Sequence, residues 1–330
     1  MLSFRPLPLL GNPHVQTILG NLLTGVPRTP RVYKRTVALP DGDRIMLHET
    51  APRRISPLPP GEGSRVRLRA PIALLVHGLG GSHRSGYMTR MTNRLGDLGW
   101  RVFRMDLRGA GAGIRLARRF YNAACSEDVR IVVENLSVAF PDTPLTVLGF
   151  SLGGNIALKF AGELAARPLP SLRAVATIAP PIDLVRCSEL LARFPFYDAF
   201  YVHHLTSQVT QHQQYLPDVP KVVFPRRMNL RQFDDFYTAP RWGYADALDY
   251  YRQASALPWI PAIRVPTFIL AARDDPFVAV EPFETLPALT AVEIHISAHG
   301  GHLGFLGRDG FGGIRWAEAQ LVNWLTKQIS

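Results

Sequence analysis

Short, uninterrupted runs of apolar residues alternate with amphipathic segments along most of the chain after residue 70. Strands that are apolar at every position are typical of a parallel sheet that helices cover on both faces. The pattern therefore predicts an α/β fold with a mostly parallel central sheet and helices on both faces. The predicted strands are residues 72–76, 102–105, 145–150, 174–178, 267–271 and 292–296, and the predicted helices are residues 90–98, 128–140, 152–166 and 314–329.

Before this region, residues 32–39 and 44–49 are two β-rich runs that Pro40-Asp41-Gly42-Asp43 separates. This turn composition between two such runs predicts an antiparallel hairpin. Residues 52–63 contain four prolines and two glycines and are expected to form a surface loop.

The interval between Ile182 and Val265 breaks the alternation and is crowded with aromatic residues. Because structureless loops of this length are uncommon in compact domains, the interval predicts a mainly helical cap inserted between two strands. Most of its aromatic rings are expected only to pack the cap onto the core. The expected organisation is a core over residues 1–182 that includes the hairpin, a cap over residues 183–260, and the rest of the core over residues 261–330.

The segment Gly149-Phe150-Ser151-Leu152-Gly153 has the form Gly-x-Ser-x-Gly, and it joins a predicted strand to a predicted helix. In that context the serine lies on a sharp turn that exposes its hydroxyl at the helix N-terminus, as a catalytic nucleophile requires. The small residues allow the strained backbone and the close approach of neighbouring segments. Ser151 is therefore the candidate nucleophile.

A second glycine-rich segment, His77-Gly78-Leu79-Gly80-Gly81, follows the predicted strand at residues 72–76. The backbone N–H groups of Leu79 and Leu152 are expected to converge as an oxyanion hole on the alkoxide that forms during attack. The His77 side chain is expected to be packed under this loop, because the chemistry uses the backbone amide.

A serine nucleophile on this kind of turn needs an acid and then a histidine later in the chain. Asp274 and Asp275 end the predicted strand at residues 267–271, and His299 and His302 follow the last predicted strand. The reaction needs one imidazole to take the serine proton and one carboxylate to orient that imidazole. The residues alone do not decide between Asp274 and Asp275 as the acid, or between His299 and His302 as the base.

These motifs resemble the α/β-hydrolase fold, and more closely its YheT-like branch, the AB hydrolase 4 family. The resemblance spans nearly the whole chain through NPHVQTIL, HGLGGSHRSGYM, GFSLGGNIALKF, FDDFYTAPRWGYADALDYYRQAS, AARDDPF and HGGHLGF. In that family the acid is the second Asp of Asp-Asp-Pro and the base is the His after Gly-Gly. The resemblance thus implies Asp275 and His302. His83 departs from the expected loop sequence and receives no role.

The net charge of +11 comes from 37 basic and 26 acidic residues, and 33 of the basic residues are arginine. No nucleic-acid motif accompanies them, so a solvated basic surface without nucleic acid is expected. The clusters Arg65/Arg67/Arg69 and Arg115/Arg118/Arg119 leave weak peripheral contact with an anionic membrane surface or an acyl-CoA phosphate as an alternative.

The segment DLRGAGAG lacks the glycine spacing and the lysine of nucleotide-binding loops, so it is not expected to bind a nucleotide. With neither a signal peptide nor a membrane span expected, the predicted location is the cytoplasm.

Taken together, the motifs predict a serine hydrolase that cleaves carboxylic esters through an acyl-enzyme on Ser151. It is expected to need no metal and no organic cofactor. The resemblance implies short- to medium-chain or lipid-derived acyl esters as small-molecule substrates. One alternative is acyl transfer from a thioester or ester to an alcohol. From a different class, the fold also serves as a non-catalytic ligand-binding protein.

Overall fold

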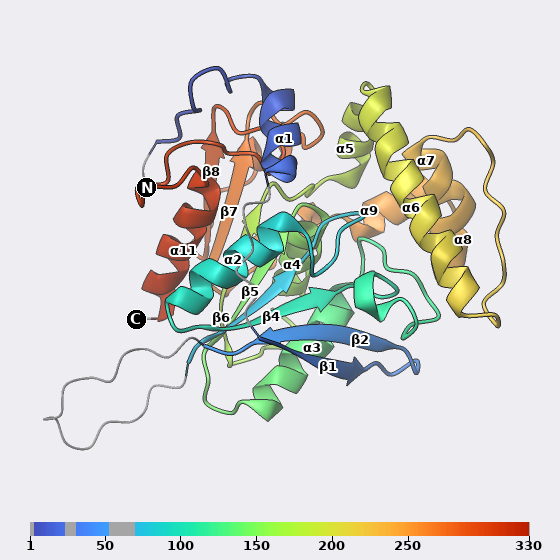
Figure 1. Ribbon diagram of the computed structural model, residues 1–330, viewed down its shortest axis with the longest axis horizontal. Helices are drawn as coiled ribbons and strands as arrows, with labels where there is room; N and C mark the ends of the chain where they lie inside the picture. Colours follow the sequence, from blue (N-terminus) through green and yellow to red (C-terminus); the bar gives the residue numbers. More distant parts are fainter. Residues whose placement is uncertain (1–2, 24–30, 53–69, 330) are drawn as a thin grey trace, which may run out of the picture.

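The computed structural model describes residues 3–23, 31–52 and 70–329. Eight strands form one sheet in the order β1-β2-β4-β3-β5-β6-β7-β8 (Figure 1). Strand β2 pairs antiparallel with both β1 and β4, and all the other pairs are parallel. The strands are β1 (Val32–Ala38), β2 (Arg44–Thr50), β3 (Ile72–Val76), β4 (Arg101–Asp106), β5 (Leu145–Phe150), β6 (Leu172–Ile178), β7 (Thr267–Ala272) and β8 (Val292–Ser297).

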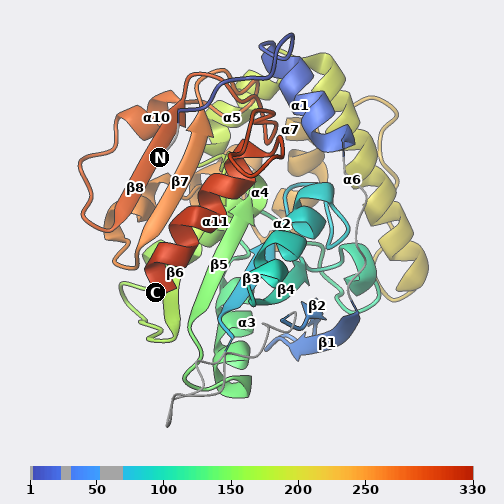
Figure 2. The same ribbon diagram turned by 60° about the vertical axis from the view of Figure 1, so that its left-hand side comes forward.

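Helices cover both faces of the sheet, as the sequence predicts. Helices α2 (Gly86–Asp97) and α11 (Trp316–Ile329) lie side by side on one face (Figure 2). Helices α3 (Ser126–Ala139) and α4 (Leu152–Glu163) cover the other. Strand β3 shows why both faces are apolar: its residues are all buried and alternate between the two clusters. The predicted α/β fold, with its hairpin of β1 and β2, is confirmed.

The chain between β6 and β7 is mainly helical and groups to one side of the sheet (Figure 1). The predicted division into a core and a cap at residues 182/183 and 260/261 stays a prediction. The interval contains α5 (Leu184–Leu191), α6 (Pro195–Tyr215), α7 (Leu230–Phe233), the π-helical turn η2 (Asp234–Thr238), α8 (Ala239–Trp242), α9 (Ala247–Ala254) and the 3-10 segment η3 (Leu257–Ala262).

Helix α1 (Pro13–Leu22) is an element that the apolar pattern did not predict. The Asn12 side chain accepts hydrogen bonds from the amides of His14 and Val15, and Pro13 begins the helix. Its buried residues are Gln16, Thr17 and Gly20, so the face that it buries is not apolar. Of the expected loop at residues 52–63, residues 53–63 lie outside the described residues, as do Arg65, Arg67 and Arg69.

Candidate active site

Ser151 lies on a strained turn between β5 and α4. Its backbone has φ +51° and ψ −122°, a left-handed conformation that a residue with a side chain seldom adopts. The glycines on either side permit this turn. A Cβ on Gly149 would lie 2.4 Å from the Gly153 carbonyl oxygen, and one on Gly153 would lie 2.4 Å from that of Val76. The turn therefore projects the Ser151 side chain away from the sheet at the N-terminus of a buried helix.

His302 lies between Ser151 and Asp275. Its Nε2 is 2.8 Å from the Ser151 Oγ, and its Nδ1 is 2.8 Å from an Asp275 carboxylate oxygen. The other Asp275 oxygen accepts hydrogen bonds from the amides of Phe277 and Val278, which fix the carboxylate. Both His302 and Asp275 are buried. This geometry suits proton transfer from a serine to an imidazole that a carboxylate orients.

The neighbouring residues Asp274 and His299 pair with each other instead. His299 Nδ1 is 3.3 Å from an Asp274 oxygen, and the His299 side chain is exposed. The other Asp274 oxygen accepts a hydrogen bond from the Gly301 amide. The residues alone left open which aspartate is the acid and which histidine is the base. The structure brings Asp275 and His302, and not Asp274 and His299, to Ser151.

The backbone segments that carry the Leu79 and Leu152 amides lie beside Ser151. Leu152 is the first residue of α4, directly after Ser151, and a Cβ on Gly78 would lie 3.0 Å from the Ser151 Cβ. Within the described residues, neither amide has a hydrogen-bond partner. Two free N–H donors beside a serine hydroxyl can stabilise a negatively charged oxygen.

Hydrogen bonds to neighbouring side chains hold the loop 77–85 that carries Leu79. The amides of Gly78 and Gly80 donate to the hydroxyls of Tyr87 and Tyr121, at 3.0 and 2.8 Å. His77 is fully buried, donates through Nδ1 to the Gly78 carbonyl and accepts from the Leu107 amide through Nε2. Burial lowers the pKa of His77, so the ring is neutral at pH 7. The His77 side chain therefore lies beneath the loop, as expected from the sequence.

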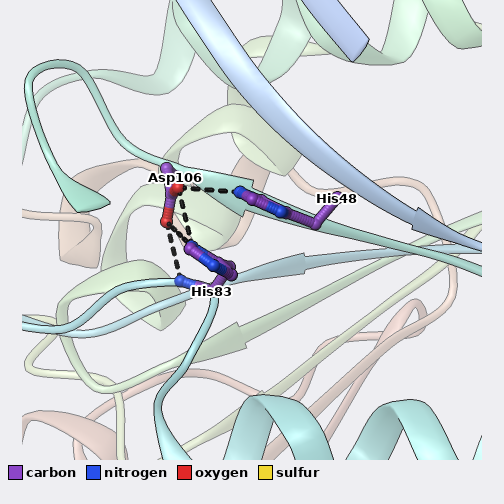
Figure 3. A group of neighbouring side chains, drawn as sticks. All are labelled: His48, His83 and Asp106. Atoms are coloured by element: carbon purple, nitrogen blue, oxygen red, sulfur yellow. Dashed lines mark hydrogen bonds and ion pairs between the residues drawn. The ribbon is translucent and has the colours of Figure 1, made fainter. Parts of the chain in front are cut away.

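His83, which received no role from the sequence, anchors the far end of this loop. Its backbone amide and its ring Nδ1 both hydrogen-bond to Asp106, at 2.7 and 2.8 Å (Figure 3). Its ring stacks on that of His48, which also binds Asp106. Burial opposes ionisation, yet the hydrogen bonds from His48 and His83 hold the pKa of Asp106 well below its ordinary value. No pattern in the sequence links these three segments.

Among the residues that the structure describes, His48, His83 and Asp106 form a cluster whose ligand atoms lie within 4.8 Å of one another, close enough to reach one metal ion. The two rings are stacked 3.4 Å apart and only 9° from parallel. A metal ion binds an imidazole nitrogen in the plane of the ring. Because the two rings are stacked and nearly parallel, no position lies in both ring planes and within bonding distance of a nitrogen of each ring. The carboxylate is also occupied by hydrogen bonds, including one from the Ala112 amide. The arrangement fits a hydrogen-bonded anchor.

The DLRGAGAG segment that begins with Asp106 also has a structural role. The Arg108 guanidinium forms two hydrogen bonds with Asp128 of α3, at 2.7 and 2.8 Å. It also binds Asp43, in the turn between β1 and β2, at 2.9 Å. This segment therefore ties the hairpin and α3 to the end of β4.

Helix α1 supports the loop that carries His302. The Thr17 hydroxyl accepts a hydrogen bond from the His302 amide at 2.9 Å. The Gln16 side chain accepts from the Leu306 amide and donates to its carbonyl. A Cβ on Gly20 would lie 2.6 Å from the Gly304 Cα, so the helix and the loop are in close contact. Sequence reasoning missed these supporting residues, although Gln16 and Thr17 lie in the NPHVQTIL motif and Gly20 follows it.

Two cavities meet at Ser151. The inner cavity, of about 830 Å³ with its open space included, lies between the core and the helices of the interval 183–260. An outer groove of about 1260 Å³, counted in the same way, runs between α1 and α6. Residues that line both are Leu79, Ser151, Tyr201, Phe277 and His302. Of the aromatic residues expected in the cap, those lining the inner cavity are Tyr201, Phe233, Tyr250 and Tyr251.

One carboxylic acid lines the inner cavity. Asp234, on the π-helical turn η2, is buried, and its Oδ2 accepts a hydrogen bond from the Tyr251 hydroxyl at 2.7 Å. Burial raises the pKa of Asp234 to about 6, despite its hydrogen bonds with Thr238 and Tyr251. The rest of the lining is mostly apolar or aromatic, which suits an acyl chain.

Two of the arginines singled out for anionic partners already have aromatic neighbours. The Arg115 and Arg119 guanidinium groups lie 4.0 and 5.1 Å from the ring centroids of Tyr215 and Trp242. Among the residues that the structure describes, no helix has both the length and the apolar character needed to span a bilayer.

Comparison with known proteins agrees with this architecture. Residues 71–309 match the family model described as the alpha/beta hydrolase fold. "Putative esterase YheT" of Escherichia coli is 31% identical over 337 residues, covering 99% of this chain and 94% of that protein. A monoacylglycerol lipase of Saccharomyces cerevisiae is 29% identical, over 77% of this chain and 59% of its own length. The chain thus spans less than two thirds of this yeast relative.

Among solved structures, the Pyrococcus furiosus esterase Pf2001 has the same fold, with a TM-score of 0.59. The two chains are 14% identical, and the match covers 100% of this chain and 99% of the esterase. The match of 239 residues to the family model and the full-length similarity to YheT lead to one assignment. This chain belongs to the α/β-hydrolase fold family, in its YheT-like branch.

Proposed function

We propose that this protein is a serine hydrolase that cleaves carboxylic esters, with Ser151 as nucleophile, His302 as general base and Asp275 as the acid. The observation that carries the proposal is the position of the His302 ring, 2.8 Å from both the Ser151 hydroxyl and the Asp275 carboxylate. A histidine that is hydrogen-bonded to both a serine and a carboxylate raises the nucleophilicity of the serine hydroxyl, which is otherwise a weak nucleophile at neutral pH.

In the first half of the reaction, the Ser151 Oγ attacks the ester carbonyl carbon and His302 Nε2 takes its proton. The carbonyl oxygen becomes negatively charged and accepts hydrogen bonds from the free amides of Leu79 and Leu152. Asp275 stabilises the imidazolium through Nδ1. The C–O bond to the alcohol then breaks, and His302 returns the proton to the leaving alcohol, which leaves an acyl-enzyme on Ser151.

In the second half, water replaces the alcohol. His302 takes a proton from the water as it attacks the acyl carbon, and returns a proton to Ser151 Oγ as the acid leaves. The inner cavity can retain the acyl chain during this step, while alcohol and water exchange through the outer groove. The mostly apolar lining of the inner cavity supports short- to medium-chain or lipid-derived acyl groups as substrates. The names of the relatives, an esterase and a monoacylglycerol lipase, point the same way.

The test is a fluorophosphonate probe followed by peptide mapping. We expect covalent labelling of Ser151 in the native protein, and no labelling after Ser151→Ala or after heat denaturation. A native protein that hydrolyses no p-nitrophenyl ester and takes up no probe would instead indicate a non-catalytic ligand-binding protein.

Acyl transfer would use the same three residues and differ only in the acceptor. Product analysis with an acyl-CoA or an ester, in water alone and with ethanol added, separates the two reactions. Formation of the ethyl ester in preference to the free acid would assign the protein as a transferase.

A further inference from the structure

The mouth of the outer groove carries four exposed apolar side chains. Ile18 and Leu22 lie one turn apart on α1, and Phe196 and Phe200 lie one turn apart on α6. Their exposed fractions are 41%, 68%, 73% and 50%, although all four line the groove. We refer to these four residues as the apolar rim.

The two helices that carry the rim are fixed against each other. His14 of α1 stacks on the Tyr197 ring of α6, and its Nδ1 is 3.2 Å from the Tyr197 hydroxyl. The same imidazole makes an edge contact with Phe194, at 5.1 Å between ring centroids. Both helices lie toward the same end of the molecule (Figures 1 and 2). The rim is therefore a fixed apolar patch, the kind of exposed surface that marks an interaction site.

The groove below the rim is lined mostly by apolar surface and leads to the reacting atoms. Asn21, Ser85 and His204 line its walls, and Ser151 and His302 lie at its inner end. A protein seated on the rim would cover this path to the serine. A lipid layer would instead surround the rim and supply ester molecules to a groove whose mostly apolar walls suit their chains.

We propose that the apolar rim inserts into the surface of aggregated lipid esters, so that the enzyme takes its substrate from a membrane or micelle surface. The identity of the ester rests on the proposed function. Insertion itself depends on the transfer of Ile18, Leu22, Phe196 and Phe200 from water to hydrocarbon, and it needs no catalysis.

The test measures binding of the Ser151→Ala protein to phosphatidylcholine vesicles by flotation, so that no lipid is consumed. We expect the protein to float with the vesicles, and Leu22→Ser and Phe196→Ser each to weaken partitioning by about tenfold. Val138→Ser is the matched control. Val138 is an aliphatic residue, 83% exposed, on α3. This helix lies at the opposite end of the molecule from α1 (Figures 1 and 2), so the replacement should change nothing. Thermal melting of each variant checks that it is folded.

Four results would overturn the proposal. The parent protein could fail to float, or Val138→Ser could weaken partitioning as much as the rim variants do. Alternatively, binding could need added phosphatidylglycerol and be unaffected by the rim variants, which would assign it to the basic surface. A dimer in sedimentation that Phe196→Ser dissociates would show that a second copy covers the rim. Because the assay uses the inactive variant, none of these results bears on whether Ser151 is the nucleophile.

Discussion

The ring of His302 lies 2.8 Å from the hydroxyl of Ser151, although 151 positions separate them in the sequence. This contact predicts that Ser151→Ala leaves the fold intact and lowers esterase kcat by several orders of magnitude. The remaining rate should exceed that in water by about 10³, because the oxyanion amides and substrate binding are retained. Turnover of a p-nitrophenyl ester, with melting temperature as the check on folding, measures this. A variant that kept a tenth of the parent turnover would rule out the mechanism.

The two Asp–His pairs allow a matched comparison. We expect Asp275→Asn to lower kcat by about 10⁴, because the neutral amide holds the imidazole in the wrong tautomer. Asp274→Asn, which alters only the pair with His299 and the bond from Gly301, should cost much less. The same order should hold for His302→Ala against His299→Ala. Greater sensitivity at Asp274 and His299 would mean that the catalytic pair is wrongly assigned.

Thr17 gives a test of how α1 supports the site. Thr17→Val removes the acceptor of the His302 amide while keeping the shape of the side chain. A small displacement of the base is enough to slow proton transfer, so we expect kcat for a short ester to fall about tenfold with KM little changed. Thr17→Ser keeps the hydroxyl and should retain the parent rate. A loss in Thr17→Ser with none in Thr17→Val would show that the methyl group, and not the hydrogen bond, is what matters.

The inner cavity predicts the preference for acyl chains. Along a series of p-nitrophenyl esters, kcat/KM should rise from acetate to a medium chain and then level or fall. Each added CH₂ that becomes buried contributes about 0.8 kcal/mol until the cavity is full. The leaving group stays constant in such a series, so the trend reports on the acyl side alone. A steady preference for acetate would mean that the helices over the site close the cavity instead of lining it.

The raised pKa of Asp234 predicts that the stability of the folded protein depends on pH. Its pKa is raised to about 6 in the folded protein, from an ordinary value of 3.8, so the folded state binds more protons between these two values. The free energy of unfolding should therefore fall as pH rises from about 4 to about 6, by roughly 3 kcal/mol from this group. Asp234→Asn keeps an oxygen for the Tyr251 hydroxyl and removes the titration. Denaturant unfolding at several pH values should show a flatter profile for this variant, and an unchanged profile would contradict the assignment.

Strands β3 and β5 were predicted to the residue because every side chain in them is buried, so the apolar run and the strand coincide. The position of Ser151 on a turn between a strand and a helix could also be predicted, since its motif needs only those two elements. Helix α1 could not be found from hydrophobic periodicity, because it buries Gln16, Thr17 and Gly20 against a loop through hydrogen bonds and close backbone contact. Only Asn12 and Pro13 carried a local signal of its start. The His48–Asp106–His83 anchor joins three segments, and nothing in any one segment indicates the others.

The contact between α1 and the His302 loop also bears on the order in which the protein assembles. Thr17 precedes His302 by 285 positions in the sequence, so their hydrogen bond can form only after the chain has been synthesised as far as His302. The nucleophile turn, the acid and the sheet strands beneath them are all made earlier. The base would then be the final group to reach its place, and a growing chain would carry Ser151 without the partner that activates it.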